Sequence, residues 1–339
     1  RGMRRAALAV ATLAALLPGA GMADPVKVDA ATFTRAETDR YMTDIVTRNG
    51  LGIMVHGREP ARVDDQPVIR MNRDTLYSSG VYDLSAGPIS VTIPEAGGRY
   101  VAVQPVSGDH YTPFVLHDGT SMITEEDIGT RYVALLARVF VDAADPDDLA
   151  EAHTIQDGIR IEQTQRGTWS VPDWDAASLD QTRSLLLQLG VMGMDGFGPR
   201  MGPRGEVDEV GHLLATAGGW GLNPESEARY FITYPEKNDG STVYLLTLGD
   251  VPVDGFWSVT VYDANGFMVK NDLGRNAVNS VTADLDPQGG VSIQFGGCTE
   301  GSPNCLPVTP GWNYTLRLYQ PRAEVQDGRW TPPVAEAAD

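Results

Sequence analysis

Residues 256–269 read FWSVTVYDANGFMV, and this stretch determines the expected fold of the C-terminal half. Alternate side chains of a strand point to opposite faces, so Trp257, Val259 and Val261 share one face. These three apolar residues predict the buried side of a strand. The opposite face, which includes Tyr262, is left for a domain interface or for a ligand.

Turn signals and further strands surround this stretch. Residues 264–266, Ala-Asn-Gly, are typical of a type I′ turn that joins the strand to residues 267–269, and residues 286–290 form a second turn signal. Further strands are expected at 242–248, 291–295 and 314–320. Antiparallel strands at this spacing favour a sandwich. We therefore expect an α+β protein that is mostly β, with a C-terminal antiparallel β-sandwich of the jelly-roll type.

The N-terminal half is also expected to be rich in strands, with helices on its flanks. The clearest strand patterns cover 99–106, 111–117 and 131–141. Helices are expected from capping boxes at 34–37 and 178–181, and from apolar spacing at 206–217. The expected division is residues 1–23, a signal peptide; 24–205, a β-rich domain with helices; and 206–339, a helix followed by the sandwich.

Residues 1–23 have the pattern of a secretory signal peptide. Arg4 and Arg5 precede an apolar run at 6–17, and the small residues Gly-Met-Ala at 21–23 suit a signal peptidase. The apolar run is shorter than the roughly 20 residues that span a bilayer, and no later segment qualifies. We expect a periplasmic or secreted protein with no membrane span.

Charge and cysteine content restrict the partners and the redox environment. The formal net charge of −19 argues against nucleic acid as a partner, because nucleic-acid binding requires basic patches. The only two cysteines are Cys298 and Cys305. An even number in an exported chain predicts a disulfide bond.

Residues 72–78 read NRDTLYS and place unusually many polar side chains before an expected strand. Arg73 and Asp74 either form a buried ion pair that fixes the loop, or Arg73 binds a substrate carboxylate that Asp74 helps to orient. Tyr77 can act as an acid, although an aromatic residue at a strand edge is more often part of a core. Asn72 completes the candidate substrate-binding residues of this segment.

Histidines supply the candidate general base. His110 is the strongest, because it lies on an expected loop at the end of a strand and titrates near neutral pH. His56 ranks second, since its loop leads into the 72–78 segment. In the last strand Arg317 is expected to close an ion pair at a domain interface, or to bind a ligand. Catalysis requires His110 to share one pocket with Arg73 and Tyr77.

No cofactor is predicted. The histidines do not follow a metal-ligand spacing, so a metal site would need residues that are distant in sequence. The chain also lacks the G-x-S-x-G elbow of serine hydrolases, the dinucleotide-binding fingerprint and the phosphate-binding loop.

Several separated motifs resemble a known pair of domains. Residues 72–78 resemble the signature of the domain of unknown function 1254. Residues 256–263 (FWSVTVYD), 304–307 (NCLP) and 316–321 (LRLYQP) resemble domain 1214, its usual C-terminal companion. The resemblance implies an exported bacterial two-domain protein that is largely β, with no assigned activity. Cys305 stands where longer members tend to have tryptophan, which suggests a branch with its own disulfide.

Two functions fit these observations. The first is an exported envelope enzyme, a hydrolase or other acid-base catalyst, with His110, Tyr77 and Asp74 at a site between the two domains. The alternative is a non-catalytic protein that binds a carbohydrate or a small acid. The sequence does not specify an oligomeric state.

Overall fold

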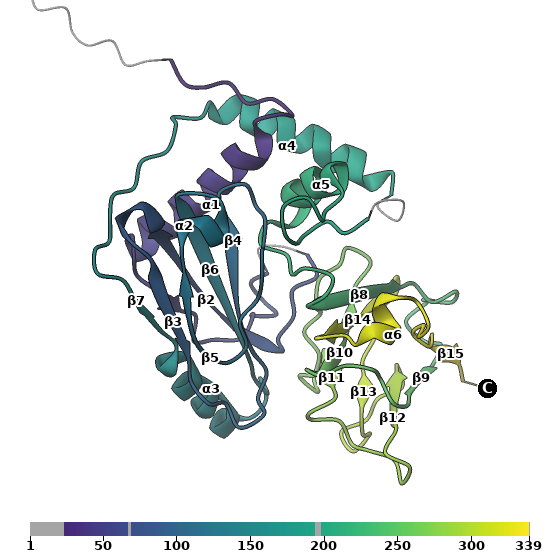
Figure 1. Cartoon of the computed structure of the whole chain (residues 1–339). Coiled ribbons are helices and arrows are strands. Elements are labelled where there is room, and N and C mark those ends of the chain that lie inside the picture. The colour runs from purple at the N-terminus through teal and green to yellow at the C-terminus, as the bar shows by residue number, and fades with distance from the viewer. Residues whose placement is uncertain (1–23, 67–68, 194–197, 339) are drawn as a thin grey trace, which may run out of the picture.

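The computed structural model describes residues 24–66, 69–193 and 198–338, and it confirms an α+β fold dominated by antiparallel sheets (Figure 1). The expected signal peptide, residues 1–23, lies outside the described residues. Among the described helices, none is long and apolar enough to cross a membrane.

The N-terminal unit is built around a four-stranded antiparallel sheet of order β1-β2-β6-β4. Its strands are β1 (Val55–His56), β2 (Thr75–Asp83), β6 (Tyr132–Phe140) and β4 (Val101–Ser107). One face of this sheet is apolar and packs against a second sheet of order β5-β3-β7. The second sheet consists of β5 (Gly119–Ile123), β3 (Ile89–Ile93) and β7 (Arg160–Glu162). Short elements close this core: η1 (Leu84–Ala86), α2 (Glu125–Ile128) and α3 (Pro146–Gly158).

Three helices cover one end of the opposite face of the main sheet. They are α1 (Phe33–Asn49), α4 (Ala176–Val191) and α5 (Glu209–Gly219). Met42 and Ile45 of α1 pack in one cluster with Val81 and Ala134 of the sheet. Helix α5 packs on α1 and α4 through Leu214. The expected domain boundary at 205/206 lies before α5. Because α5 packs on two helices of the N-terminal unit, the packing places the boundary after this helix.

The C-terminal unit is a sandwich of two four-stranded sheets, as the sequence predicted. The first sheet has the order β11-β10-β14-β8 and the second β13-β12-β9-β15. The first contains β11 (Ala277–Asn279), β10 (Trp257–Tyr262), β14 (Asn313–Tyr319) and β8 (Ala228–Thr233). The second contains β13 (Cys305–Leu306), β12 (Val291–Phe295), β9 (Tyr244–Leu248) and β15 (Glu336–Ala337), and α6 (Ala323–Gln326) follows β14.

Side-chain alternation in β10 is confirmed. Trp257, Val259 and Val261 lie in the core between the two sheets. The turn at 264–266 also forms, with the Gly266 amide donating to the Asp263 carbonyl at 3.1 Å. The expected strand at 267–269 is wrong, because residues 277–279 pair with β10 instead.

Aromatic side chains join the two units. Tyr100 and Phe140 from the main N-terminal sheet pack with Phe256 and Tyr319 from the sandwich. The Phe256 and Tyr319 rings stack with centroids 4.2 Å apart, and Phe140 meets Phe256 edge-on at 4.8 Å. The outer face of the main sheet is thus covered by helices at one end and by the sandwich at the other. The polar site lies between these two covers.

Candidate functional site

Arg138 lies in the middle of the main N-terminal sheet, between the part that the helices cover and the part that the sandwich covers. Strand pairing sets it opposite Tyr77 in β2 and opposite Ala102 in β4, so its side chain leaves the sheet between the two covers. Arg138 is only 7% exposed. Its guanidinium donates to the Gln104 side-chain oxygen at 2.7 Å and to the Gly221 carbonyl at 2.9 Å. Among the described residues no carboxylate lies within 4.0 Å of it.

Arg317 occupies the corresponding place in the sandwich. It is 3% exposed and faces the N-terminal unit from β14, where it pairs with Tyr230 in β8. Its guanidinium donates to the Tyr262 hydroxyl at 2.6 Å and to the Arg70 carbonyl at 2.8 Å. The ion pair expected for Arg317 is wrong over the described ranges, because no carboxylate lies within 4.0 Å of its nitrogens.

Asp74 is the carboxyl that influences Arg317 from a greater distance. It is 2% exposed, and its Oδ2 atom has no hydrogen-bond partner in the described part of the chain. Burial raises the pKa of Asp74, and the nearby Arg317 guanidinium only partly opposes this effect. Because burial favours the protonated carboxyl, Asp74 is a weak counter-ion. The predicted Arg73–Asp74 ion pair is also absent from the described residues, since no contact within 4.0 Å joins the two side chains.

Two half-exposed tyrosines accompany the two arginines. Tyr77 is 45% exposed and Tyr230 is 44% exposed. The Arg138 guanidinium lies 5.7 Å from the centroid of the Tyr77 ring, and that of Arg317 lies 6.0 Å from the Tyr230 ring. Solvent therefore reaches the interface beside two buried cations. We call Tyr77, Arg138, Tyr230 and Arg317 the arginine–tyrosine cluster.

Groups from both halves of this cluster surround Tyr230 and influence its pKa. Although Tyr230 is 44% exposed as a whole residue, the removal of solvent from its hydroxyl raises the pKa of Tyr230, while Arg138 and Arg317 act in the opposite direction. Tyr77 adds to the upward shift of the pKa. Electrostatic effects of this kind operate over a few ångströms in a poorly solvated environment. The contacts agree: Tyr230 accepts from Asn223, two residues after the Gly221 carbonyl that binds Arg138, and its ring lies 6.0 Å from the Arg317 guanidinium.

Two other predicted binding residues adjoin the cluster. The Asn72 amide donates to the Tyr77 hydroxyl at 2.9 Å. Tyr262 donates to the Met71 carbonyl at 2.7 Å and accepts from Arg317, so it connects β10 to the residue that precedes the 72–78 segment. The structure thus gathers Asn72, Tyr77, Tyr262 and Arg317, four of the predicted site residues, around one interface.

His110 does not join Arg73 and Tyr77 in one pocket. Its ring is fully buried, with Nδ1 2.8 Å from the Thr216 hydroxyl and Nε2 accepting from the Gly221 amide at 2.8 Å. Burial lowers the pKa of His110 well below its usual value. Both ring nitrogens are occupied in the core, so the geometry gives this side chain a supporting role. It orients Gly221, whose carbonyl accepts from Arg138.

His56 also lies away from the cluster. Its Nδ1 atom is 2.8 Å from the Ser78 hydroxyl, and Gln156 donates to the same hydroxyl at 3.2 Å. Ser78 follows Tyr77 in β2, so the two side chains point to opposite faces of the sheet. The histidine therefore lies on the side of α3.

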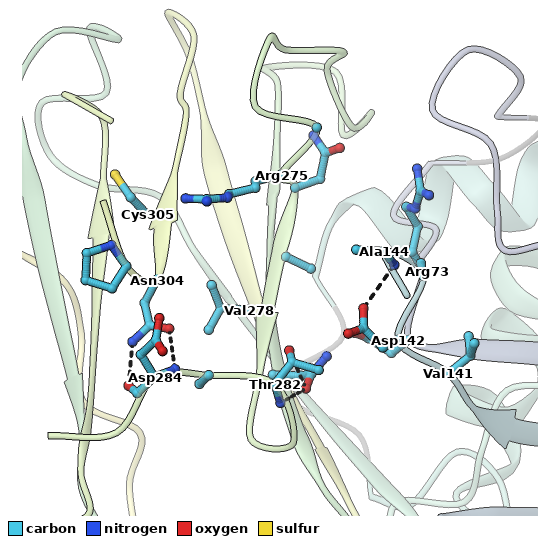
Figure 2. Close-up of a pocket in the computed structure, with 18 residues that line it drawn as sticks. Arg73, Val141, Asp142, Ala144, Arg275, Val278, Thr282, Asp284, Asn304 and Cys305 are labelled. Atoms are coloured by element: carbon cyan, nitrogen blue, oxygen red, sulfur yellow. Dashed lines mark hydrogen bonds between the residues drawn. The ribbon is translucent and has the colours of Figure 1, made fainter. Parts of the chain in front are cut away.

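Arg73 and Asp74 line a separate cavity of about 340 Å³ between the two units. Figure 2 shows Arg73 and Asp142 on one side of it, with Arg275 and Asp284 on the other. Much of its polar lining is already used. The Asp142 carboxylate accepts from the Ala144 amide, and the Asp284 backbone is held by the Asn304 side chain. None of the residues of the arginine–tyrosine cluster lines this cavity.

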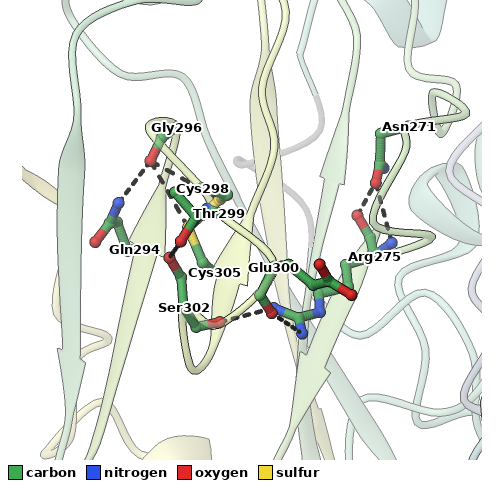
Figure 3. The surroundings of a disulfide bond; sticks show 9 residues. All are labelled: Asn271, Arg275, Gln294, Gly296, Cys298, Thr299, Glu300, Ser302 and Cys305. Carbon is green, nitrogen blue, oxygen red and sulfur yellow. Dashed lines mark hydrogen bonds between the residues drawn. A yellow bond between two sulfur atoms is a disulfide. The ribbon is translucent and has the colours of Figure 1, made fainter.

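The predicted disulfide Cys298–Cys305 is confirmed and closes a loop beside this cavity (Figure 3). Arg275 donates to the Ser302 carbonyl at 2.7 Å and to the Glu300 carbonyl at 3.3 Å. These contacts attach the loop to the sheet of β10. The role of the disulfide is therefore local and structural.

Within the described ranges, no group of three or more His, Cys, Asp or Glu side chains is placed to hold a metal ion.

The sequence analysis did not identify Arg138 or Tyr230. Arg138 stands in a strand whose other residues, YVALLA before it and VF after it, are mostly apolar. A lone arginine in such a strand is the same signal that drew attention to Arg317. Tyr230 carries no comparable signal, because only the pairing of β8 with β14 brings it to the interface.

Comparisons with known proteins agree with the expected pair of domains. Residues 52–122 match the family described as "Protein of unknown function (DUF1254)", and residues 227–323 match "Protein of unknown function (DUF1214)". Comparison with curated protein sequences finds no match.

Two solved structures share the fold. The VPA0106 protein from Vibrio parahaemolyticus has a TM-score of 0.69 at 19% identity, with 91% of this chain and 98% of that chain covered. An uncharacterized protein from Burkholderia cenocepacia has a TM-score of 0.50 at 15% identity, with 91% and 87% covered. At these identities the similarity establishes the fold alone.

Proposed function

We propose that this chain, which carries a DUF1254 region followed by a DUF1214 region, binds a small organic acid at the interface between its two units. Neither family description names an activity, so the proposal rests on the chemistry of the interface. The observation that carries it is the pair Arg138 and Arg317. One comes from each unit, both are buried, and neither has a carboxylate within 4.0 Å in the described part of the chain.

The physical argument concerns the cost of burying charge. A guanidinium removed from water destabilises the fold unless an anion or several hydrogen bonds compensate it. Each guanidinium has five N–H donors, and Arg138 uses two of them on neutral acceptors. A ligand carboxylate would supply the missing negative charge, and its two oxygens match the planar fork of arginine.

The local charge around the cluster supports the same ligand, in contrast to the charge of the whole chain. The protein carries a formal net charge of −19, which repels anions in general. Near the cluster, however, Arg70 adds a third guanidinium that donates to Asn313 and Tyr234 without a carboxylate within 4.0 Å in the described ranges. A local excess of positive charge in an acidic protein favours specific binding of a small anion.

The test is a thermal-stability screen of the full chain. Small carboxylic acids are compared with their neutral amides at the same concentration. An acid present at about 100 times its dissociation constant should stabilise the fold by about 2.7 kcal/mol, which is several degrees in melting temperature. The amides should have little effect, because they lack the charge that pairs with the arginines.

A matched pair of variants locates the site. Arg138→Met removes the buried charge and should reduce the stabilisation by the acid to about 1.4 kcal/mol or less, the value that corresponds to tenfold weaker binding. Arg160→Met makes the same change at an exposed arginine of β7, outside the interface, and should leave it intact. If acids and amides stabilise the protein equally, or if both variants respond like the wild type, the proposal fails.

We also propose that the protein acts outside the cytoplasm, in the periplasm or after secretion. The pattern of residues 1–23 and the disulfide Cys298–Cys305 support this location, because such bonds persist in oxidising compartments. Cell fractionation should find the chain outside the cytoplasm only when residues 1–23 are present. Retention of the full chain in the cytoplasm would contradict it.

A further inference from the structure

The hydroxyl groups of Tyr77 and Tyr230 have the same hydrogen-bonding arrangement. Each phenol oxygen accepts from an asparagine amide, Tyr77 from Asn72 at 2.9 Å and Tyr230 from Asn223 at 3.1 Å. Neither hydroxyl donates to a residue in the described part of the chain. Because an amide N–H occupies one side of each oxygen, each phenolic proton remains available for another acceptor.

The side chains around these phenols are also donors. Arg317 uses three of its five N–H donors, on Thr260, Tyr262 and the Arg70 carbonyl. Its two remaining donors and the three of Arg138 are free of described partners. The cluster therefore presents guanidinium and phenol protons from both units.

Acceptors are scarce in the same place. The side-chain oxygen of Gln104 is occupied by Arg138, and the Tyr262 hydroxyl donates its proton to the Met71 carbonyl. Asp74 is a carboxyl whose charge would act on Arg317, and its burial favours the protonated form. A ligand with hydrogen-bond acceptors can therefore satisfy the free donors of the cluster. A ligand with donors would place them against the donors of the protein and leave both without partners.

We infer that the ligand is a carboxylate that carries a further hydrogen-bond-accepting oxygen close to the carboxylate, as oxo-acids and hydroxy-acids do. The carboxylate pairs with Arg138 and Arg317, and the additional oxygen accepts from the phenols of Tyr77 and Tyr230. This inference rests on the proposed function and specifies its ligand class. Tyr77 and Tyr230 are half-exposed, so the cluster borders on solvent.

The experiment compares pairs of acids that differ by oxygen substituents. Butyrate is compared with 2-oxobutyrate, glutarate with 2-oxoglutarate, and cyclohexanecarboxylate with glucuronate, by calorimetric titration of the full chain. In at least one pair the oxygen-bearing acid should bind more tightly by about tenfold, the contribution of one or two hydrogen bonds.

Variants then assign the effect to the phenols. Tyr77→Phe and Tyr230→Phe keep the rings but remove the hydroxyls, so each should lower the ratio of the two affinities, which is the preference for the oxygen-bearing acid over the plain acid. Tyr41→Phe, in α1, makes the same change outside the cluster and should preserve the preference.

The outcomes separate the two proposals. If plain and oxygen-bearing acids bind equally, or if the phenylalanine variants keep the wild-type preference, the ligand class is refuted while carboxylate binding stands. If no acid of any pair binds, the carboxylate proposal fails and this inference fails with it.

Discussion

At the scale of single residues, the pairing of buried charges distinguishes the interface from the rest of the protein. Two buried carboxylates elsewhere are held by arginine: Glu37 by Arg183, with nitrogen and oxygen 2.5 Å apart, and Asp83 by Arg131 at 2.7 Å. Arg138 and Arg317 lack such partners among the described residues. The fold thus pairs these two carboxylates with arginine but leaves the guanidinium groups of Arg138 and Arg317 available to an anion.

Asp39 in α1 gives a prediction that concerns pH. Burial raises the pKa of Asp39 to about 6, against a hydrogen bond from the Trp174 indole at 2.9 Å. The folded state therefore binds its proton more tightly than the unfolded state, and stability falls as pH rises from about 4 to about 6. Asp39→Asn should remove up to roughly 3 kcal/mol of this loss. The measurement is denaturant unfolding at pH 4 and pH 7.

We expect Asp39→Asn to increase the free energy of unfolding at pH 7 and to leave it almost unchanged at pH 4. Asp44→Asn, at an exposed position of the same helix, is the matched control and should change neither value. Equal effects of Asp39→Asn at both pH values would contradict the assignment.

Strand alternation explains which site residues the sequence could reveal. It separated Tyr262 and Arg317 from the core faces of their strands, and the structure places both at the interface. Alternation cannot tell which strand faces another across a domain boundary, so it missed Arg138 and Tyr230. It also could not show that both nitrogens of His110 are occupied in the core, because Thr216 and Gly221 are distant in sequence.

At the scale of elements, β14 shows how one strand serves both packing and function. Tyr314, Leu316 and Leu318 point into the sandwich core, whereas Arg317 and Tyr319 face the N-terminal unit. Most strands were predictable from such alternation and from turn residues. The strand at 267–269 was not, because a turn signal determines the reversal of the chain but not which later segment completes the sheet. The strand expected at 111–117 is also wrong, since only Leu116 pairs there, in an isolated bridge with Val103.

The disulfide loop gives the prediction at this scale. Replacing Cys298 and Cys305 together with serine should lower the free energy of unfolding by about 2.5 kcal/mol, since closing a short loop restricts the unfolded chain. Chemical denaturation measures the difference. Reduction of the wild-type protein is the control and should produce a similar decrease. No difference between the double variant and the wild type would show that Arg275 alone holds the loop.

At the scale of the whole molecule, the relation between the two units controls the site, because each unit contributes one arginine. His117 and Glu227 connect the units beside the aromatic contact. The His117 ring nitrogens lie 2.8 Å from the Val101 carbonyl and 2.9 Å from the Glu227 carboxylate, both of which are acceptors. Such an arrangement favours the doubly protonated ring.

This connection predicts a second pH dependence. Although burial opposes it, the Glu227 carboxylate raises the pKa of His117 above 6.5. The stabilisation is therefore fully present below pH 6.5 and is lost as pH rises through the pKa of the folded state. The wild type should lose about 1 kcal/mol between pH 6 and pH 9, and Glu227→Gln should lose less. Unfolding experiments at the two pH values measure this, and an identical loss in the variant would exclude the connection as its cause.

The central claim is that Arg138 and Arg317 bind one carboxylate between the units. The most direct measurement is calorimetric titration of the wild type, Arg138→Met, Arg317→Met and the double variant with the acid that binds best. We predict that each single variant weakens binding at least about tenfold and that the double variant is little worse than either, because both side chains hold the same group. Wild-type affinity in either single variant would contradict the account.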